Sequence, residues 1–178
     1  MKDWIQAARL RTLPLASACV LTGAALARGE AMENDVARAR FWVVFAGILL
    51  TVVCLQVLSN FANDLGDAEN GADDATRLDR AVASGRITPA AMRRAVVIGA
   101  VLCLFLGIAT VTIALKGTGL LLPAAAIVAL GIASIGAAYK YTAGANPYGY
   151  RGLGDLAVFL FFGLIGVGGT AFLLAHEW

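Results

Sequence analysis

Charged side chains are scarce in this 178-residue chain: Asp, Glu, Lys and Arg make up 15% of it, whereas hydrophobic residues make up 60%. A soluble domain carries about 25% charged residues. The net charge of +2 is too small to indicate nucleic-acid binding, and no basic patch interleaved with aromatic residues is present. The composition therefore predicts an integral membrane protein that is surrounded by lipid.

Histidine and cysteine are also rare. There is one histidine, His176, and the three cysteines, Cys19, Cys54 and Cys103, lie far apart inside apolar runs. This spacing excludes a zinc-binding motif and a disulfide framework. We expect all three cysteines to be reduced and buried as small hydrophobic side chains.

Five apolar runs, by contrast, are long enough and free enough of charge to cross a membrane as helices. They cover approximately residues 12–27, 41–63, 95–115, 117–139 and 156–175. This pattern predicts a single all-α domain over residues 1–178, a multi-pass transmembrane helix bundle. Because small residues allow close helix packing in lipid, we expect that role for Gly131, Gly136, Gly163, Gly166, Gly168 and Gly169.

Lysine and arginine in the connecting segments set the expected orientation, because they are enriched on the cytoplasmic side. With the N-terminus inside, ten of the 14 basic residues fall on the inner side and four on the outer side. We therefore expect the N-terminus and the polar segment 64–94 to face the cytoplasm, in the inner membrane of a prokaryotic cell. A cleaved signal peptide is the alternative for the first run, with Lys2, Arg9 and Arg11 as its basic region.

The most informative segment follows the second run: residues 60–74 contain five acidic residues and three asparagines. If the helix of the second run continues, Asn60, Asp64 and Asp67 fall at positions i, i+4 and i+7 and share one face. Carboxylates at the end of a membrane-spanning helix are costly to keep dry and are usually functional. The spacing predicts a site for a hard cation, and a merely solvated acidic loop is the alternative.

The ligand types in this segment favour Mg²⁺, which usually shares one or two carboxylates with a phosphate. Asn63 adds an amide oxygen, and Asp73 follows Gly71, where a turn could fold the chain back toward the helix. An EF-hand is excluded because its spacing requires oxygen ligands at Gly66 and Ala68, which have none.

Basic and aromatic residues on the same side admit two interpretations each. Arg77, Arg80 and Arg86 fit the general excess of positive charge on the inner side, and they also fit a clamp for a diphosphate. In the loop 139–155, four tyrosines lie close to Lys140. They fit an interfacial aromatic belt, or a lining in which the lysine pairs with diphosphate and the phenol rings face a developing cation.

These residues resemble the UbiA superfamily of membrane prenyltransferases, and more closely its 1,4-dihydroxy-2-naphthoate polyprenyltransferase branch. The family's first aspartate motif, Asn-Asp-x-x-Asp, is similar to residues 63–67, and the Gly-x-Asp extension of that branch is similar to residues 71–73. The flanking segments 4–15, 56–62, 84–87 and 141–154 are similar as well. The resemblance covers essentially the whole chain.

The resemblance implies an all-α fold of about nine spans, in which helices satisfy their own backbone hydrogen bonds in lipid. It implies transfer of a polyprenyl group from polyprenyl diphosphate to 1,4-dihydroxy-2-naphthoate, giving demethylmenaquinone with loss of the carboxylate. Mg²⁺ held by the aspartates would bind the diphosphate and stabilise it as it leaves. Together with the loop chemistry, the resemblance gives metal binding to Asn60, Asn63, Asp64, Asp67 and Asp73, catalysis to Asp64, Asp67 and Lys140, and substrate binding to Arg77, Arg80, Tyr139, Tyr148, Arg151 and Asp155.

One departure from the family concerns its second aspartate motif, which belongs to the later half of the fold. Nothing after Asp74 resembles that motif, and Asp155 alone cannot replace it. We therefore expect the N-terminal part of a larger enzyme: a fragment, a truncated gene product or one part of a split enzyme. A separate C-terminal half is the expected partner, without which the chain is expected to be inactive.

Two other functions stay open at this point. One is a different branch of the superfamily that acts on 4-hydroxybenzoate or haem, although residues 71–73 and 148–151 argue against it. The other is a membrane protein that binds divalent cations without chemistry. That function predicts further acidic residues along a path through the membrane, and the sequence has them only at the ends of the second and fifth runs.

Overall fold

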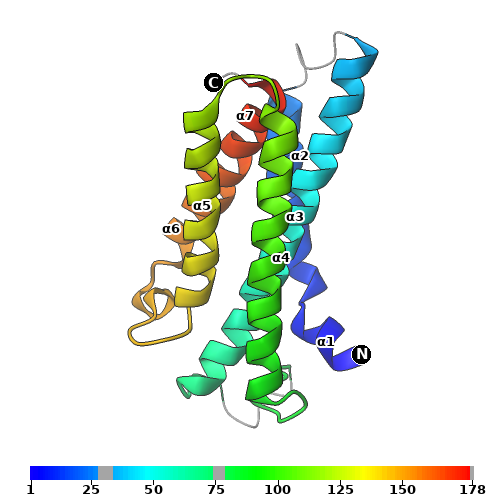
Figure 1. Cartoon of the computed structure of the whole chain (residues 1–178). Coiled ribbons are helices and arrows are strands. Elements are labelled where there is room, and N and C mark those ends of the chain that lie inside the picture. The colour runs from blue at the N-terminus through cyan, green and yellow to red at the C-terminus, as the bar shows by residue number, and fades with distance from the viewer. Residues whose placement is uncertain (28–33, 74–78, 177–178) are drawn as a thin grey trace.

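The computed structural model describes residues 1–27, 34–73 and 79–176, and every regular element in these ranges is helical. The predicted all-α class is confirmed. Helices α3 and α4 run side by side along the length of the bundle, α5 flanks α4, and the last helices return alongside α2 (Figure 1). The elements are α1 (Lys2–Ala7), η1 (Leu10–Thr12), α2 (Leu13–Leu26), α3 (Asp35–Glu69), α4 (Pro89–Leu115), α5 (Leu121–Lys140), η2 (Tyr148–Arg151), α6 (Gly154–Val158), η3 (Phe159–Gly168) and α7 (Gly169–Ala175).

The two longest helices begin at side-chain caps. Before α3, the side chain of Asn34 accepts a hydrogen bond from the amide of Ala37 at 2.9 Å. Before α4, Thr88 does the same for the amide of Ala91 at 3.2 Å, and Pro89 is the first helical residue. A cap of this kind satisfies an amide that has no partner within the helix, and proline costs nothing at the first position.

Among the described residues, four helices are long and apolar enough to cross a membrane: α3, α4, α5 and the continuous stretch Gly154–Ala175. Four of the five predicted spans are therefore confirmed. The first predicted span falls on α2, which has 14 residues. At 1.5 Å per residue it is about 21 Å long, shorter than the roughly 30 Å of a hydrocarbon core, so α2 alone does not reach across.

The last stretch includes η3, a ten-residue segment of wide π-type helix, and it packs closely against α2. A Cβ atom added to Gly166 would lie 2.9 Å from the sulfur of Cys19, and one added to Gly23 would lie 2.5 Å from the carbonyl oxygen of Val167. The predicted packing role is thus confirmed for Gly166. At Gly131, Gly136, Gly168 and Gly169 an added Cβ would meet no other described part of the chain within 4 Å, so these glycines make no close helix contact among the described residues.

The buried apolar residues form two clusters, one toward each end of the bundle. At the end where α3 stops and α4 begins, called here the acidic end, the cluster is centred on Leu58, Leu65, Met92 and Ile87. At the opposite end, the cluster is centred on Val20, Phe41, Val44, Val111 and Phe172. The two clusters hold α3 and α4 together over most of their length.

His176 closes the opposite end of the bundle. Its backbone adopts a left-handed conformation, with φ +64°, directly after α7. The ring nitrogen Nε2 donates a hydrogen bond to the carbonyl oxygen of Ala114 at 2.8 Å, and the guanidinium of Arg40 contacts the same ring. Burial, and then the positive charge of Arg40, lower the pKa of His176 below its ordinary value of 6.5.

We expect the protein to lose thermal stability as the pH falls below about 6.5, where an unperturbed histidine becomes protonated. The folded state disfavours the imidazolium, so the unfolded state binds more protons in this range, and acidification favours unfolding. The measurement is the unfolding midpoint of detergent-solubilised protein at several pH values, with His176→Asn as the comparison. A wild-type and a variant chain with identical pH dependence would contradict the assignment to His176.

Candidate functional site

The acidic segment continues α3 as one buried helical face. Asn60, Asp64 and Asp67 are 3%, 2% and 6% exposed, and α3 extends to Glu69. The prediction that they share a face is confirmed. Carboxylates are rarely buried to this degree unless they have partners.

Asp64 binds the backbone of the turn that begins at Ala81. Its carboxylate accepts hydrogen bonds from the backbone amides of Ala81 at 3.0 Å and Val82 at 3.4 Å. The turn that begins there is closed by a hydrogen bond from the amide of Ile87 to the carbonyl oxygen of Ala81 at 3.0 Å. Ala81, Val82 and Ile87 are buried in the apolar cluster of the acidic end, so this turn, and Arg80 with it, is fixed against α3.

Asp67, Asp73 and Arg80 form an ion-pair cluster. The guanidinium of Arg80 lies 2.8 Å from a carboxylate oxygen of Asp67 and 2.8 Å from one of Asp73. The turn at Gly71, with φ +69°, brings Asp73 back so that its amide donates to the carbonyl oxygen of Asp67 at 3.2 Å. The predicted fold-back of Asp73 is thus confirmed.

Arg80 keeps unused hydrogen-bonding capacity in this cluster. Its side chain is 12% exposed, and its second terminal nitrogen is buried without a hydrogen-bond partner among the described residues. A buried donor of this kind costs free energy until an acceptor reaches it. The cluster therefore offers a cationic donor next to two carboxylates.

Tyr150 connects the loop between α5 and α6 to the ion-pair cluster. Its hydroxyl donates a hydrogen bond to Asp67 at 2.7 Å. Burial, and then the hydrogen bond and negative charge of Asp67, raise the pKa of Tyr150. The sequence prediction assigned substrate binding to Tyr139 and Tyr148. Tyr150 was one of the four tyrosines noted in the loop 139–155, but its position in the sequence did not distinguish it from the others.

Thr142 and Gly66 fix the start of that loop against α3. The hydroxyl of Thr142 donates to the side-chain oxygen of Asn63 at 3.1 Å, and its carbonyl oxygen accepts from the side chain of Asn70 at 2.7 Å. A Cβ atom at Gly66 would lie 2.7 Å from the backbone of Thr142 and Ala143. The two inner segments can approach this closely only because residue 66 has no side chain.

An apolar cavity of about 640 Å³ runs through the bundle beside these contacts. It lies among α2, α3, α4, α5 and the last helices, and most of its lining is aliphatic or phenylalanine. Polar groups gather where Asn63, Tyr141 and Tyr148 line it. Because Asn63 is next to Asp64 in the chain, the polar part of the cavity adjoins the acidic end.

The other predicted site residues lie around the cluster without joining it. Asn60 donates to the carbonyl oxygen of Ala8 at 2.8 Å and to the hydroxyl of Thr12 at 2.9 Å, so it binds α3 to the N-terminal segment. Tyr148 donates to the carbonyl oxygen of Ala137 at 3.0 Å. Four further predicted residues are exposed and form no hydrogen bond or ion pair with another described residue. They are Tyr139, Lys140, Arg151 and Asp155. Arg77 and Asp74 lie outside the described residues.

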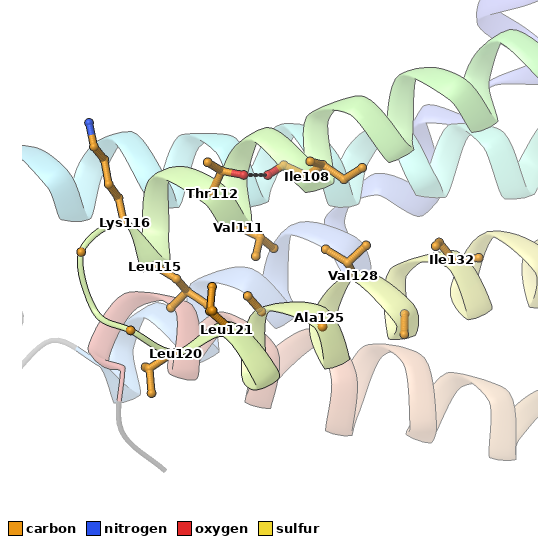
Figure 2. A pocket seen from close by; sticks show the side chains of 14 residues that line it. Ile108, Val111, Thr112, Leu115, Lys116, Leu120, Leu121, Ala125, Val128 and Ile132 are labelled. Atoms are coloured by element: carbon orange, nitrogen blue, oxygen red, sulfur yellow. Dashed lines mark hydrogen bonds between the residues drawn. The ribbon is translucent and has the colours of Figure 1, made fainter.

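A second hollow lies far from the acidic cluster, between the end of α4 and the start of α5 (Figure 2). Its volume is about 630 Å³, and its lining includes Val111, Leu115, Leu121 and Val128. Figure 2 shows Lys116 at its edge, with the amine pointing away from these side chains. Nothing in this hollow matches the chemistry of the acidic end.

A model of the UbiA prenyltransferase family matches residues 16–178, which is most of the chain. The chain belongs to the UbiA prenyltransferase family. The resemblance carried by residues 63–67 and 71–73 is thereby confirmed, and the family is a multi-pass membrane fold, so this UbiA chain is an integral membrane protein.

Relatives of this UbiA chain include proteins named 1,4-dihydroxy-2-naphthoate octaprenyltransferase. The one from Haemophilus influenzae is 39% identical over 182 residues, which cover 99% of this chain and 56% of the relative. The one from Escherichia coli is 41% identical over 175 residues (97% and 54%), and the one from Mycobacterium tuberculosis is 39% identical over 176 residues (97% and 54%). The chain thus spans about half the length of these relatives. No solved structure matches it.

Tyr150→Phe removes one hydroxyl from the ion-pair cluster and is expected to lower the free energy of unfolding by about 1 kcal/mol, because the lost hydrogen bond has a charged acceptor but Tyr150 is half exposed. For a chain of this length the unfolding midpoint should fall by roughly 2–4 °C. The control is Tyr139→Phe, because Tyr139 is 40% exposed and its hydroxyl forms no hydrogen bond with another described residue. Equal midpoints for the two variants would contradict a stabilising contact between Tyr150 and Asp67.

Proposed function

We propose that this chain is the diphosphate-binding half of a prenyltransferase that transfers a polyprenyl group from polyprenyl diphosphate to 1,4-dihydroxy-2-naphthoate, giving demethylmenaquinone. The observation that carries the proposal is the convergence of Asp67, Asp73 and Arg80 beside an apolar cavity. A prenyl diphosphate joins a polyanionic head to a long apolar chain, and this bundle offers surroundings for both parts. The names of the relatives support the choice of acceptor.

The residues of the cluster suit Mg²⁺ in the way it is usually held, by one or two carboxylates and the phosphates of a substrate. Asp67 and Asp73 already converge on a cation, the guanidinium of Arg80. Within the described part of the chain, no group of three or more His, Cys, Asp or Glu side chains is arranged to hold a metal, so we do not expect a cage built by protein alone. We propose Asp67 and Asp73 as ligands, with Asn63 and Asp64 beside them; bound there, Mg²⁺ would neutralise charge on the departing diphosphate.

Arg80 is the residue best placed to bind the diphosphate directly. Its buried, unpartnered nitrogen would gain an acceptor from a phosphate oxygen, and charge-assisted bonds of this kind are strong. Asp64 supports this role by holding the backbone of Ala81 and Val82 next to Arg80. Lys140 is exposed at the end of α5, and Arg151 is exposed next to Tyr150 in the following loop. We propose that both add positive charge for the incoming substrate.

The cavity supplies the apolar surroundings that the reaction needs. Loss of diphosphate leaves an allylic cation, which water would quench, and an apolar lining keeps water away. Tyr141 and Tyr148 line the cavity near Asn63 with their rings in edge-to-face contact at 5.3 Å. We propose that aromatic faces in this part of the cavity stabilise the cation while the naphthoate ring approaches it.

We further propose that the acidic end faces the cytoplasm and that the protein lies in the inner membrane. The basic residues are concentrated in the segments at this end, as the distribution of lysine and arginine in membrane proteins requires for the cytoplasmic side. Diphosphate substrates and Mg²⁺ are available on that side. In a cysteine-free background, a membrane-impermeant maleimide would test this orientation through single cysteines introduced at Asp3 and Asp35, which lie at opposite ends.

The decisive experiment supplies the part of the fold that the relatives have beyond the matched region. The chain is co-expressed with the corresponding C-terminal segment of the E. coli relative, and membranes receive labelled octaprenyl diphosphate, 1,4-dihydroxy-2-naphthoate and Mg²⁺. We expect prenylated product from the two segments together and none after chelation of Mg²⁺.

Each segment alone serves as a control, and neither is expected to give product. Preference for 4-hydroxybenzoate as acceptor would indicate another branch of the family. Absence of product together with absence of Mg²⁺-dependent diphosphate binding, in a complex shown to assemble, would contradict the proposal.

A further inference from the structure

Helices α3 and α4 approach each other closely along a line of small residues. A Cβ atom added to Gly47 would lie 2.6 Å from Thr110, one added to Gly99 would lie 3.3 Å from Leu58, and one added to Gly107 would lie 3.7 Å from Thr51. The contact positions rise along α3 (47, 51 and 58) as they fall along α4 (110, 107 and 99), so the two helices are antiparallel. The glycines therefore fix the register of α3 against α4, because only a residue without a side chain leaves room for such close contact. Small residues usually have this role where helices pack in lipid.

Cys54 of α3 and Cys103 of α4 occupy the middle of this line. Their sulfur atoms are 3.1 Å apart, and Cys103 is 3% exposed. All three cysteines are free, as predicted, and the predicted burial is confirmed for Cys19 and Cys103, whereas Cys54 is only partly buried. Cys54 and Cys103 form a pair that their separation in the sequence did not reveal. Cys19 is directed elsewhere, with its thiol donating to the carbonyl oxygen of Ala16 at 2.9 Å.

We infer that Cys54 and Cys103 are a redox-active dithiol that closes to a disulfide between α3 and α4. The sulfurs need to move closer by about 1 Å to reach a normal S–S bond. Oxidation breaks both S–H bonds and forms one S–S bond, and two protons and two electrons pass to a membrane-permeant acceptor of the azo or quinone class. The disulfide carries no charge, so it suits the apolar surroundings of the pair.

The cavity provides a route to this pair. Cys103 lines it, so a small apolar oxidant that enters the cavity meets a thiol directly. The disulfide would enclose residues 54–103, the part of the chain that carries Asp64, Asp67 and Arg80. Oxidation would therefore restrain the hairpin that holds the ion-pair cluster.

The test uses the full chain in detergent micelles, treated with diamide, an azo compound that becomes a hydrazine as it takes up the two hydrogens. After denaturation, free thiols are counted with a maleimide, and linked peptides are identified by mass spectrometry. We expect the count to fall from the three cysteines of the chain to one, with Cys54 linked to Cys103 in a monomeric product.

Two serine variants make the result specific. Cys19→Ser should still lose two thiols, whereas Cys103→Ser should lose none within the monomer. Three free thiols after treatment of folded wild-type protein would overturn the inference. So would a disulfide that involves Cys19 or joins two chains instead of Cys54 and Cys103.

Discussion

Replacement of Asp67 with asparagine is expected to reduce Mg²⁺-dependent prenyl transfer by about 100-fold or more, the usual effect of removing a group that stabilises developing charge. The substitution keeps the shape of the side chain and leaves an oxygen for the hydroxyl of Tyr150. It removes the negative charge that holds Arg80 at 2.8 Å and that we propose for Mg²⁺. The measurement is the rate of product formation by the assembled halves over a range of Mg²⁺ concentrations.

Stability has to be separated from activity in this variant, because the side chains of Asp67 and Arg80 are only 9% and 12% exposed. Removing one partner of a buried ion pair costs about 3–5 kcal/mol. Arg80 retains Asp73, so we expect the loss for Asp67→Asn to lie below that range. A thermal melt of the purified variant gives the temperature below which its activity can be compared with that of the wild type.

Asp35→Asn is the matched control for the Asp67 variant. The side chain of Asp35 is 94% exposed, and its ion pair with Arg38 lies within one turn of α3, at the opposite end of the bundle. Exposed pairs of this kind contribute little to stability. We expect both the rate and the melting midpoint to stay near wild type. An Asp67→Asn variant as active as Asp35→Asn would remove Asp67 from the proposed metal site.

Local patterns in the sequence were sufficient to predict the helices and the arrangement of the acidic face. The spacing of Asn60, Asp64 and Asp67 depends only on helical periodicity, and the membrane-spanning helices depend only on runs of apolar residues. These features are decided within a few residues. For that reason they follow from the sequence without knowledge of the rest of the fold.

Contacts between distant segments could not be predicted in the same way. Tyr150 bonds to Asp67 across 83 positions, and Cys54 meets Cys103 across 49. Both contacts depend on how the loop after α5 and the α3–α4 hairpin pack, which no local pattern specifies. The run at residues 12–27 was correctly predicted to be helical, but the prediction that it crosses the membrane was wrong, because the 14 residues of α2 are too few.

Gly66→Ala is expected to be strongly destabilising although alanine is the better helix former by about 1 kcal/mol. The added Cβ would lie 2.7 Å from the backbone of Thr142 and Ala143, where no flexible side chain can yield. Overpacking costs about 1–3 kcal/mol. Displacing the loop also breaks the hydrogen bonds from Thr142 to Asn63 and from Asn70 to Thr142, each worth about 1 kcal/mol. The unfavourable terms exceed the gain in helix propensity, so we expect the free energy of unfolding to fall by about 2–4 kcal/mol.

Gly136→Ala makes the same chemical change but is not expected to destabilise the protein. Gly136 lies inside α5, and a Cβ atom there would meet no described atom within 4 Å. Only the gain in helix propensity remains, so its unfolding midpoint should stay or rise, whereas that of Gly66→Ala should fall. Because the displaced loop carries Tyr150, the Gly66 variant should also lose prenyl transfer in the assembled enzyme. Two variants with the same midpoint would show that the loop does not depend on the close approach at Gly66.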